Sequence, residues 1–311
     1  MHGIGGESMA IDSQWANVVA LLLFEGANNS TSIVDVKQHA FTAAGNAKIT
    51  TSDYPFGASG SCLTLDGTGD YVSATGASDF ALGSGDFIVE VVFKTTDNNC
   101  CLVDFFSSGN AGWQINITSG GKLNFYSASS IKTGGVTVND GAWRYAAVTR
   151  ESGSIHFYTC VLGGTLAEDG SGTSNSTNFS YVASTFAIGA QVATRNTTYD
   201  FSGTIGPVRI TKGTSRPGFT LPSALFLCPT ISGVVLDASA VPVAKIVSAI
   251  KRSTMGSVVA VLSDGASGAY KLRTIDYSEH VVMEFDTATY PLVDGGSGEN
   301  AFIYDRVIPE G

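Results

Sequence analysis

Residues 87–94 read FIVEVVFK, and this alternation decides the fold class. Every second residue from Phe87 to Phe93 is apolar, whereas Glu90 and Lys94 lie on the opposite face of an extended chain. Because side chains alternate across a strand with a period of two, we expect one face in a core and the other in water. The same alternation recurs in residues 143–148, 155–158 and 205–210.

Clusters of glycine, asparagine and aspartate separate these segments, for example residues 66–70 (DGTGD), 83–86 (GSGD) and 139–141 (NDG). Such clusters supply the positive φ angles and side-chain hydrogen bonds that hairpin turns need. No stretch of a dozen residues carries the apolar stripe of a helix. The sequence therefore predicts an all-β protein of antiparallel sandwiches with little helix.

Prolines between residues 217 and 229 interrupt the alternation, which restarts at Ile231. We expect a flexible arm at residues 1–12, a large sandwich at 13–228 and a smaller immunoglobulin-like or transthyretin-like β-sandwich at 229–311. Strands of the smaller domain are expected at residues 231–236, 245–251, 258–262, 269–272, 280–285 and 302–308.

Charge and hydropathy exclude two classes of partner. The chain has 17 basic and 27 acidic residues, a net charge of −10, so no binding to nucleic acid is expected. The apolar run 18–24 is far shorter than the ~20 residues that span a bilayer, so no membrane insertion is expected. The first residues lack the basic flank and cleavage site of a secretory signal, which favours folding in a cytoplasm.

Cys100 and Cys101 stand out among the five cysteines because they follow the polar residues 97–99 (DNN), which read as an exposed loop. An exposed adjacent pair can bridge to another chain, so both are candidates for an inter-subunit disulfide. The alternative is that the cysteines are small buried apolar side chains.

Motifs for catalysis are missing from the sequence, which has no phosphate loop, nucleophile elbow or zinc helix. The nearest match to the paired carboxylates of one glycosidase family, ExDxxE, is residues 284–286 (EFD) followed by Thr289, which lacks the second glutamate. We expect a protein that is not an enzyme and requires no cofactor. Asp66 and Asp70 flank a glycine turn and are candidate calcium ligands; the alternative is that they cap backbone amides of an ordinary turn.

Five blocks follow one another along the larger domain: residues 15–26 (WANVVALLLFEG), 63–72 (LTLDGTGDYV), 86–93 (DFIVEVVF), 140–150 (DGAWRYAAVTR) and 201–213 (FSGTIGPVRITKG). In this order they resemble the laminin-G-like, or concanavalin-A-like, jelly-roll domain in the form common in bacteriophage proteins. Residues 231–237, 242–245 and 268–272 resemble carboxypeptidase-regulatory-like sandwiches. Together with residues 300–309 they look like a terminal module of tailed-phage structural proteins.

The resemblance implies a non-enzymatic virion protein displayed on a tail fibre, baseplate or capsid surface and assembled in the host cytoplasm. Its expected partners are other virion proteins and further copies of the chain, as a homo-oligomer or as lattice neighbours. Adhesion to a host glycan would follow from the lectin relatives of the family, but the sequence identifies no glycan-binding residue. The alternative is a lectin-type carbohydrate-binding module outside a virion.

Overall fold

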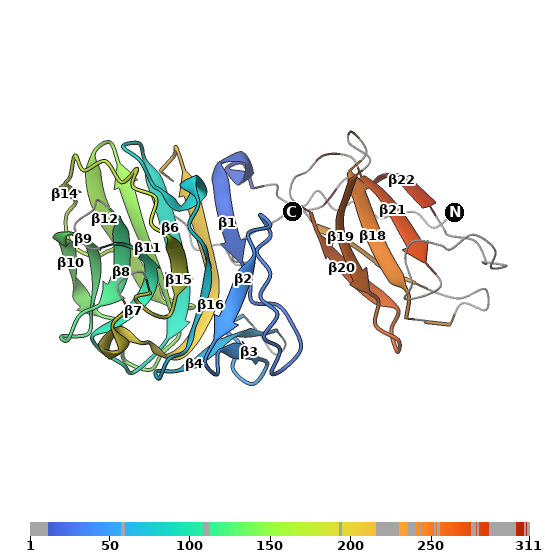
Figure 1. Ribbon diagram of the computed structural model, residues 1–311, viewed down its shortest axis with the longest axis horizontal. Helices are drawn as coiled ribbons and strands as arrows, with labels where there is room; N and C mark the ends of the chain where they lie inside the picture. Colours follow the sequence, from blue (N-terminus) through green and yellow to red (C-terminus); the bar gives the residue numbers. More distant parts are fainter. Residues whose placement is uncertain are drawn as a thin grey trace. The chain divides into compact units, whose positions relative to one another are not determined.

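The computed structural model describes residues 12–56, 60–107, 112–192, 195–215, 230–235, 241–242, 244–251, 253, 256–274, 278, 280–285, 303–307 and 309. The chain divides into two compact units, one of Ala16–Phe226 and one that contains Leu227–Gly311. We call them the jelly-roll domain and the C-terminal domain (Figure 1). The predicted boundary near residue 228 and residues 1–11 of the predicted arm lie outside the described residues.

Among the described residues, regular structure is β-strand with three short 3-10 helices, η1 Trp15–Asn17, η2 Ser78–Phe80 and η3 Thr197–Tyr199. The strands of the jelly-roll domain are β1 Val18–Leu22, β2 Phe41–Ala44, β3 Lys48–Thr50, β4 Cys62–Asp66, β5 Tyr71–Thr75, β6 Phe87–Lys94, β7 Cys100–Phe105, β8 Trp113–Ile117, β9 Lys122–Ser127, β10 Ser129–Thr137, β11 Arg144–Glu151, β12 Ser154–Val161, β13 Ala167–Glu168, β14 Thr173–Ser174, β15 Thr185–Ile188 and β16 Ser202–Lys212. The all-β prediction is confirmed. No described helix is long and apolar enough to cross a membrane.

Two antiparallel sheets form the jelly-roll domain. In the described part of the chain, sheet A has the order β13-β12-β11-β6-β16-β4-β3, with β1 paired to β16 and β14 paired to β12. Sheet B has the order β10-β9-β8-β7-β15-β5-β2. Neighbours in these orders are often distant in the sequence, so the chain crosses repeatedly between the sheets, as in a jelly roll.

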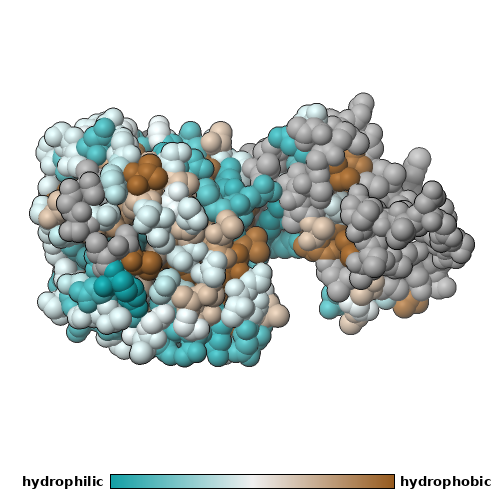
Figure 2. Space-filling model, viewed as in Figure 1, coloured by the Kyte–Doolittle hydropathy of each residue, from teal (hydrophilic) through white to brown (hydrophobic). Residues whose placement is uncertain are grey.

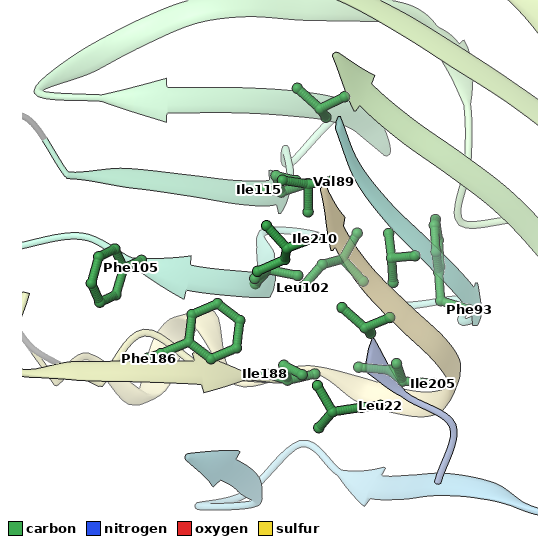
Figure 3. Packing of buried hydrophobic residues seen from close by; sticks show 14 of the residues in the cluster. Leu22, Val89, Phe93, Leu102, Phe105, Ile115, Phe186, Ile188, Ile205 and Ile210 are labelled. Atoms are coloured by element: carbon green, nitrogen blue, oxygen red, sulfur yellow. The ribbon is translucent and has the colours of Figure 1, made fainter. Parts of the chain in front are cut away.

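The core lies between the two sheets. Val89, Phe93 and Ile210 of sheet A point toward Leu102 and Ile115 of sheet B (Figure 3). Aromatic rings fill one end, where Phe80 stacks on Phe186 with ring centroids 4.2 Å apart. The buried Trp113 indole donates to the Phe80 carbonyl at 2.8 Å, which satisfies its only polar group. The apolar face that the alternation predicts for β6 thus lies in the core.

The prediction that Glu90 faces water is wrong. Its side chain is fully buried on the outer side of sheet A, where the Tyr145 hydroxyl donates to Oε1 at 2.7 Å. Arg209, its cross-strand neighbour on β16, donates from Nε to Oε2. A buried carboxylate needs such partners because unpaired burial of charge is costly. Alternation gives the face of a residue, but it does not give what covers that face.

The C-terminal domain is a smaller β-sandwich. Its strands are β17 Thr230–Val234, β18 Ile246–Lys251, β19 Gly256–Leu262, β20 Ala269–Arg273, β21 His280–Phe285 and β22 Ile303–Val307. In the described residues β17 pairs with β20, and β19-β18-β21-β22 form a second sheet. Buried apolar side chains of both sheets, among them Ile231, Val247 and Leu272, form its core. The predicted strands of this domain agree with these bounds to within about two residues.

Candidate functional site

The outer face of sheet B carries a row of polar side chains. On β8, Trp113, Ile115 and Ile117 belong to the core, so Gln114 and Asn116 point to the opposite face. Strand β9 repeats the pattern, because Leu123 and Phe125 are core residues and Asn124 and Tyr126 alternate with them. The register sets Asp104 opposite Gln114, and Asn116 opposite Asn124. The polar residues therefore form a row across the strands.

Hydrogen bonds join this row into what we call the amide ladder: Asp104, Gln114, Asn116, Asn124, Ser130 and Thr133. Gln114 Nε2 donates to Asp104 Oδ1 at 3.2 Å, and Asn116 Nδ2 donates to Gln114 Oε1 at 2.9 Å. Asn124 Nδ2 donates to Asn116 Oδ1 at 2.9 Å. Asn124 Oδ1 accepts from the hydroxyls of Ser130 and Thr133 on β10. The ladder therefore extends from β7 to β10.

Asp104 sets the direction of every amide in the ladder. Its carboxylate is fully buried and also accepts the backbone N–H of Val192 at 2.8 Å and of Phe106 at 3.3 Å. An ionised carboxylate only accepts hydrogen bonds, so Gln114 must present its NH₂ to Asp104 and its oxygen to Asn116. Asn116 and Asn124 are oriented in the same way, because each donates its NH₂ to the oxygen of the preceding amide. One buried charge thus holds three side-chain amides in one orientation.

The amide ladder lines a groove of about 410 Å³, within the range of roughly 300–1,000 Å³ that is typical of small-molecule sites. Aromatic side chains wall this groove, which we call the sheet B groove: Phe106 and Tyr126 meet edge to face with centroids 5.3 Å apart, and Tyr199 of η3 also lines it. All of its lining residues in the described chain are uncharged. Amides beside aromatic rings suit a ligand with both hydroxyl groups and apolar faces.

A second set of contacts fixes the loop that carries Tyr199. Asp200, the residue after η3, is buried and pairs through both carboxylate oxygens with Arg195. Asp200 Oδ2 also accepts the backbone N–H of Gly69 at 2.8 Å, which ties the loop to the β4–β5 turn. The hydrogen bond with Asp200 raises the pKa of Arg195, so the guanidinium stays charged. The Tyr199 wall of the groove is therefore anchored to the sandwich.

The calcium candidates Asp66 and Asp70 lie together at a different pocket of about 440 Å³, at the β4–β5 turn. Asp70 accepts the backbone N–H groups of Asn46 and Asp66. Asp66 accepts the N–H of Thr68 and the Asn46 side chain, and these hydrogen bonds lower the pKa of Asp66. All four carboxylate oxygens thus serve turn hydrogen bonds. The described residues form no cluster of three or more His, Cys, Asp or Glu side chains suited to a metal, and the calcium role stays a prediction.

The expectation that Cys100 and Cys101 lie in an exposed loop is wrong. Both belong to β7 and are fully buried, and both are free thiols. Burial raises the pKa of both, and Asp97 adds to the effect at Cys100 and Asp104 at Cys101. The polar residues before them end at Asn99, where a positive φ of 54° turns the chain into the strand. The inter-subunit bridge therefore lacks the exposure on which its prediction rested.

The residues of the amide ladder are missing from the sequence predictions. Their signal is present in residues 113–117 (WQINI) and 123–126 (LNFY), where amides alternate with core residues. That signal predicts a polar strand face and cannot show that two such faces are adjacent and in register. Of the glycosidase-like segment, residues 286–290 and the Glu284 side chain lie outside the described residues.

The chain was compared with known protein families and solved structures. No curated protein matches the chain in sequence. Similar solved structures include domain 4 of AbnA, an extracellular GH43 arabinanase from Geobacillus stearothermophilus (18% identity, 63% of this chain and 93% of that chain covered, TM-score 0.45). They also include the botulinum neurotoxin serotype D binding domain (11% identity, 95% of this chain and 80% of that chain covered, TM-score 0.48). A third is Trypanosoma rangeli sialidase (15% identity, 63% of this chain and 31% of that chain covered, TM-score 0.44). A family model described as the concanavalin A-like lectin/glucanases superfamily matches residues 66–216. With the two-sheet topology, this match shows that the first domain has the concanavalin A-like lectin/glucanase jelly-roll fold.

Proposed function

We propose that the jelly-roll domain binds carbohydrate in the sheet B groove. The observation that carries the proposal is the amide ladder, held in one orientation by Asp104 and walled by Phe106, Tyr126 and Tyr199. Sugars present hydroxyls that both donate and accept, and their C–H faces pack on aromatic rings. The match of residues 66–216 to a lectin/glucanase superfamily supports the same chemistry.

The ladder keeps hydrogen-bonding capacity for a ligand. A side-chain amide has two N–H groups, and Asn116 and Asn124 each use one of them inside the ladder. The hydroxyls of Ser130 and Thr133 are exposed beside them. Because the amides are already oriented, a ligand does not have to order them on binding, which favours affinity.

A glycan array probed with the full chain tests this function. We expect binding to a subset of glycans, and we expect N124A to weaken it at least tenfold, because the Asn124 amide on β9 joins Asn116 of β8 to the hydroxyls of β10. The matched control is N28A, which removes an exposed asparagine outside the groove. Y126F should bind nearly as well as the wild type, and Y126A should bind poorly, because the ring supplies the packing face. An array without binding, or equal binding by N124A and N28A, would refute the site.

The setting of this binding is a second part of the proposal. On the sequence resemblance alone, we propose that the chain is a non-enzymatic tailed-phage virion protein in which the C-terminal domain, of carboxypeptidase-regulatory-like type, docks or spaces the jelly roll. Mass spectrometry of purified particles should then find the chain in several copies. Release of new reducing ends from a bound glycan would contradict the non-enzymatic part, and absence from every particle preparation would contradict the virion part.

A further inference from the structure

The described lining of the sheet B groove presents no charged side chain to a ligand. Its lining consists of amide, hydroxyl and aromatic side chains with Ile117, and every lining residue in the described chain is uncharged. The chemistry of recognition here must therefore rest on dipoles and on ring packing.

A buried carboxylate, that of Asp104, adjoins the lining of the groove through Gln114. Asp104 ends the ladder and is fully buried, and its hydrogen-bond donors given above are neutral N–H groups. The thiol of Cys101, which pairs with Asn116 in register, lies close enough to Asp104 and Asp200 for both carboxylates to raise its pKa. Buried charges are poorly screened, so their potential extends into the groove.

The basic side chains near the groove are directed elsewhere. Lys122 of β9 donates its ammonium to the Gly135 carbonyl at 2.7 Å and to the Thr137 hydroxyl at 2.8 Å. Arg195 is paired with Asp200 and stacks over the Tyr71 ring. Neither lines the groove. A carboxylate on a ligand would therefore lose its water without gaining a cation, which is unfavourable.

The extent of the ladder adds a second constraint. It joins β7, β8, β9 and β10, three interstrand steps of about 4.8 Å each, or about 14 Å in total. This length exceeds a single sugar ring. Gln114 Oε1 and Asn116 Oδ1 each accept one hydrogen bond from the next amide of the ladder, so the same amide arrangement occurs more than once along the row.

We infer that the sheet B groove selects uncharged oligosaccharides and rejects sugars that carry a carboxylate, such as sialylated or uronate-containing chains. This inference rests on the proposed carbohydrate-binding function and names the ligand class of the same site. The selectivity has two sources: the described lining has dipoles but no cation, and the buried group at the end of the ladder, Asp104, is an acid.

Matched pairs of probes test the inference with the full chain. We would titrate lactose and cello-oligosaccharides, and in parallel 3′-sialyllactose and the C6-oxidised cello-oligosaccharides, by calorimetry at constant salt. For any neutral probe that binds, we expect the carboxylate-bearing counterpart to bind at least tenfold more weakly, about 1.4 kcal/mol. A pair of charge variants gives the cause: S119K adds a cation at the exposed rim of the groove, and T165K adds the same charge at an exposed position outside it.

The outcomes separate the two proposals. S119K should reduce the preference for the neutral probe, and T165K should leave it unchanged. Equal or tighter binding of the acidic probes by the wild type would overturn the selectivity and leave carbohydrate binding intact. Identical selectivity of S119K and T165K would overturn its electrostatic cause. If no probe of either kind and no array glycan binds, the proposed function fails, and the inference fails with it.

Discussion

Replacing Asn116 by aspartate changes one NH₂ group to oxygen in the middle of the amide ladder. Asn116 Nδ2 donates to Gln114 Oε1 at 2.9 Å, and N116D leaves two acceptors facing each other. An isolated glutamine would respond by turning its amide over. Gln114 cannot do so, because its Nε2 is held 3.2 Å from Asp104 Oδ1 and the turned oxygen would meet that carboxylate. The ladder therefore has no low-energy rearrangement.

The expected cost follows from this geometry. A lost hydrogen bond whose acceptor stays buried costs about 1–3 kcal/mol, and we expect the free energy of unfolding to fall by that amount. S130A, at the end of the ladder, should cost only about 0.5–1.5 kcal/mol, because Thr133 still donates to Asn124 at 3.0 Å. The introduced carboxyl can donate when it is protonated. Its pKa is therefore raised in the folded state, and the loss caused by N116D should shrink as the pH falls.

Urea unfolding followed by tryptophan fluorescence measures the effect, because Trp113, one of the three tryptophans, is buried in the core of the jelly-roll domain. N116D should lower the midpoint with an unchanged slope. N28D introduces the same charge at an exposed asparagine and is the control. If N116D and N28D are equally stable, or if the loss in N116D grows at acidic pH, Asp104 does not orient the ladder and the reasoning is refuted.

Three further predictions concern groups outside the groove. The pKa of His39 is raised, mainly by its hydrogen bond to buried Asp35. The contribution of His39 to stability is therefore complete below its unfolded pKa of about 6.5 and is lost as the pH rises through the higher folded value. Over that pH window Tm should fall in the wild type and change less in H39Q, and parallel profiles of the two proteins would contradict this. Cys100 and Cys101 should react with a thiol reagent only on unfolding and give a single band on a non-reducing gel, whereas a ladder that reductant collapses would restore the inter-subunit disulfide. D70N should lower the free energy of unfolding by about 1–3 kcal/mol, because Asp70 is buried and accepts hydrogen bonds from two backbone N–H groups. Addition of EDTA to the wild type should leave Tm unchanged, and a fall in Tm with EDTA would favour the calcium role.

Much of the fold could be predicted from local patterns. The alternation in β6 and the glycine turns around it are local properties, and they correspond to strands and hairpins of the jelly-roll domain. Predictions that depended on exposure were less successful. Glu90 and Cys100 both read as exposed from their neighbours in the sequence, yet both are buried, because strands distant in the chain and partners such as Tyr145 lie against them.

The sequence by itself determined the all-β class, the alternation of faces and the positions of β6, β11, β12 and β16 and of the strands of the C-terminal domain. These depend on the period of two and on turn residues a few positions apart. The tertiary structure alone decided the candidate site, the sheet B groove with its amide ladder. Gln114, Asn116 and Asn124 form one ladder only because β8 and β9 pair in a particular register, and Asp104 orients it only because β7 adjoins β8. Register and burial are set by packing over the whole domain, and a single strand carries no information about its neighbour.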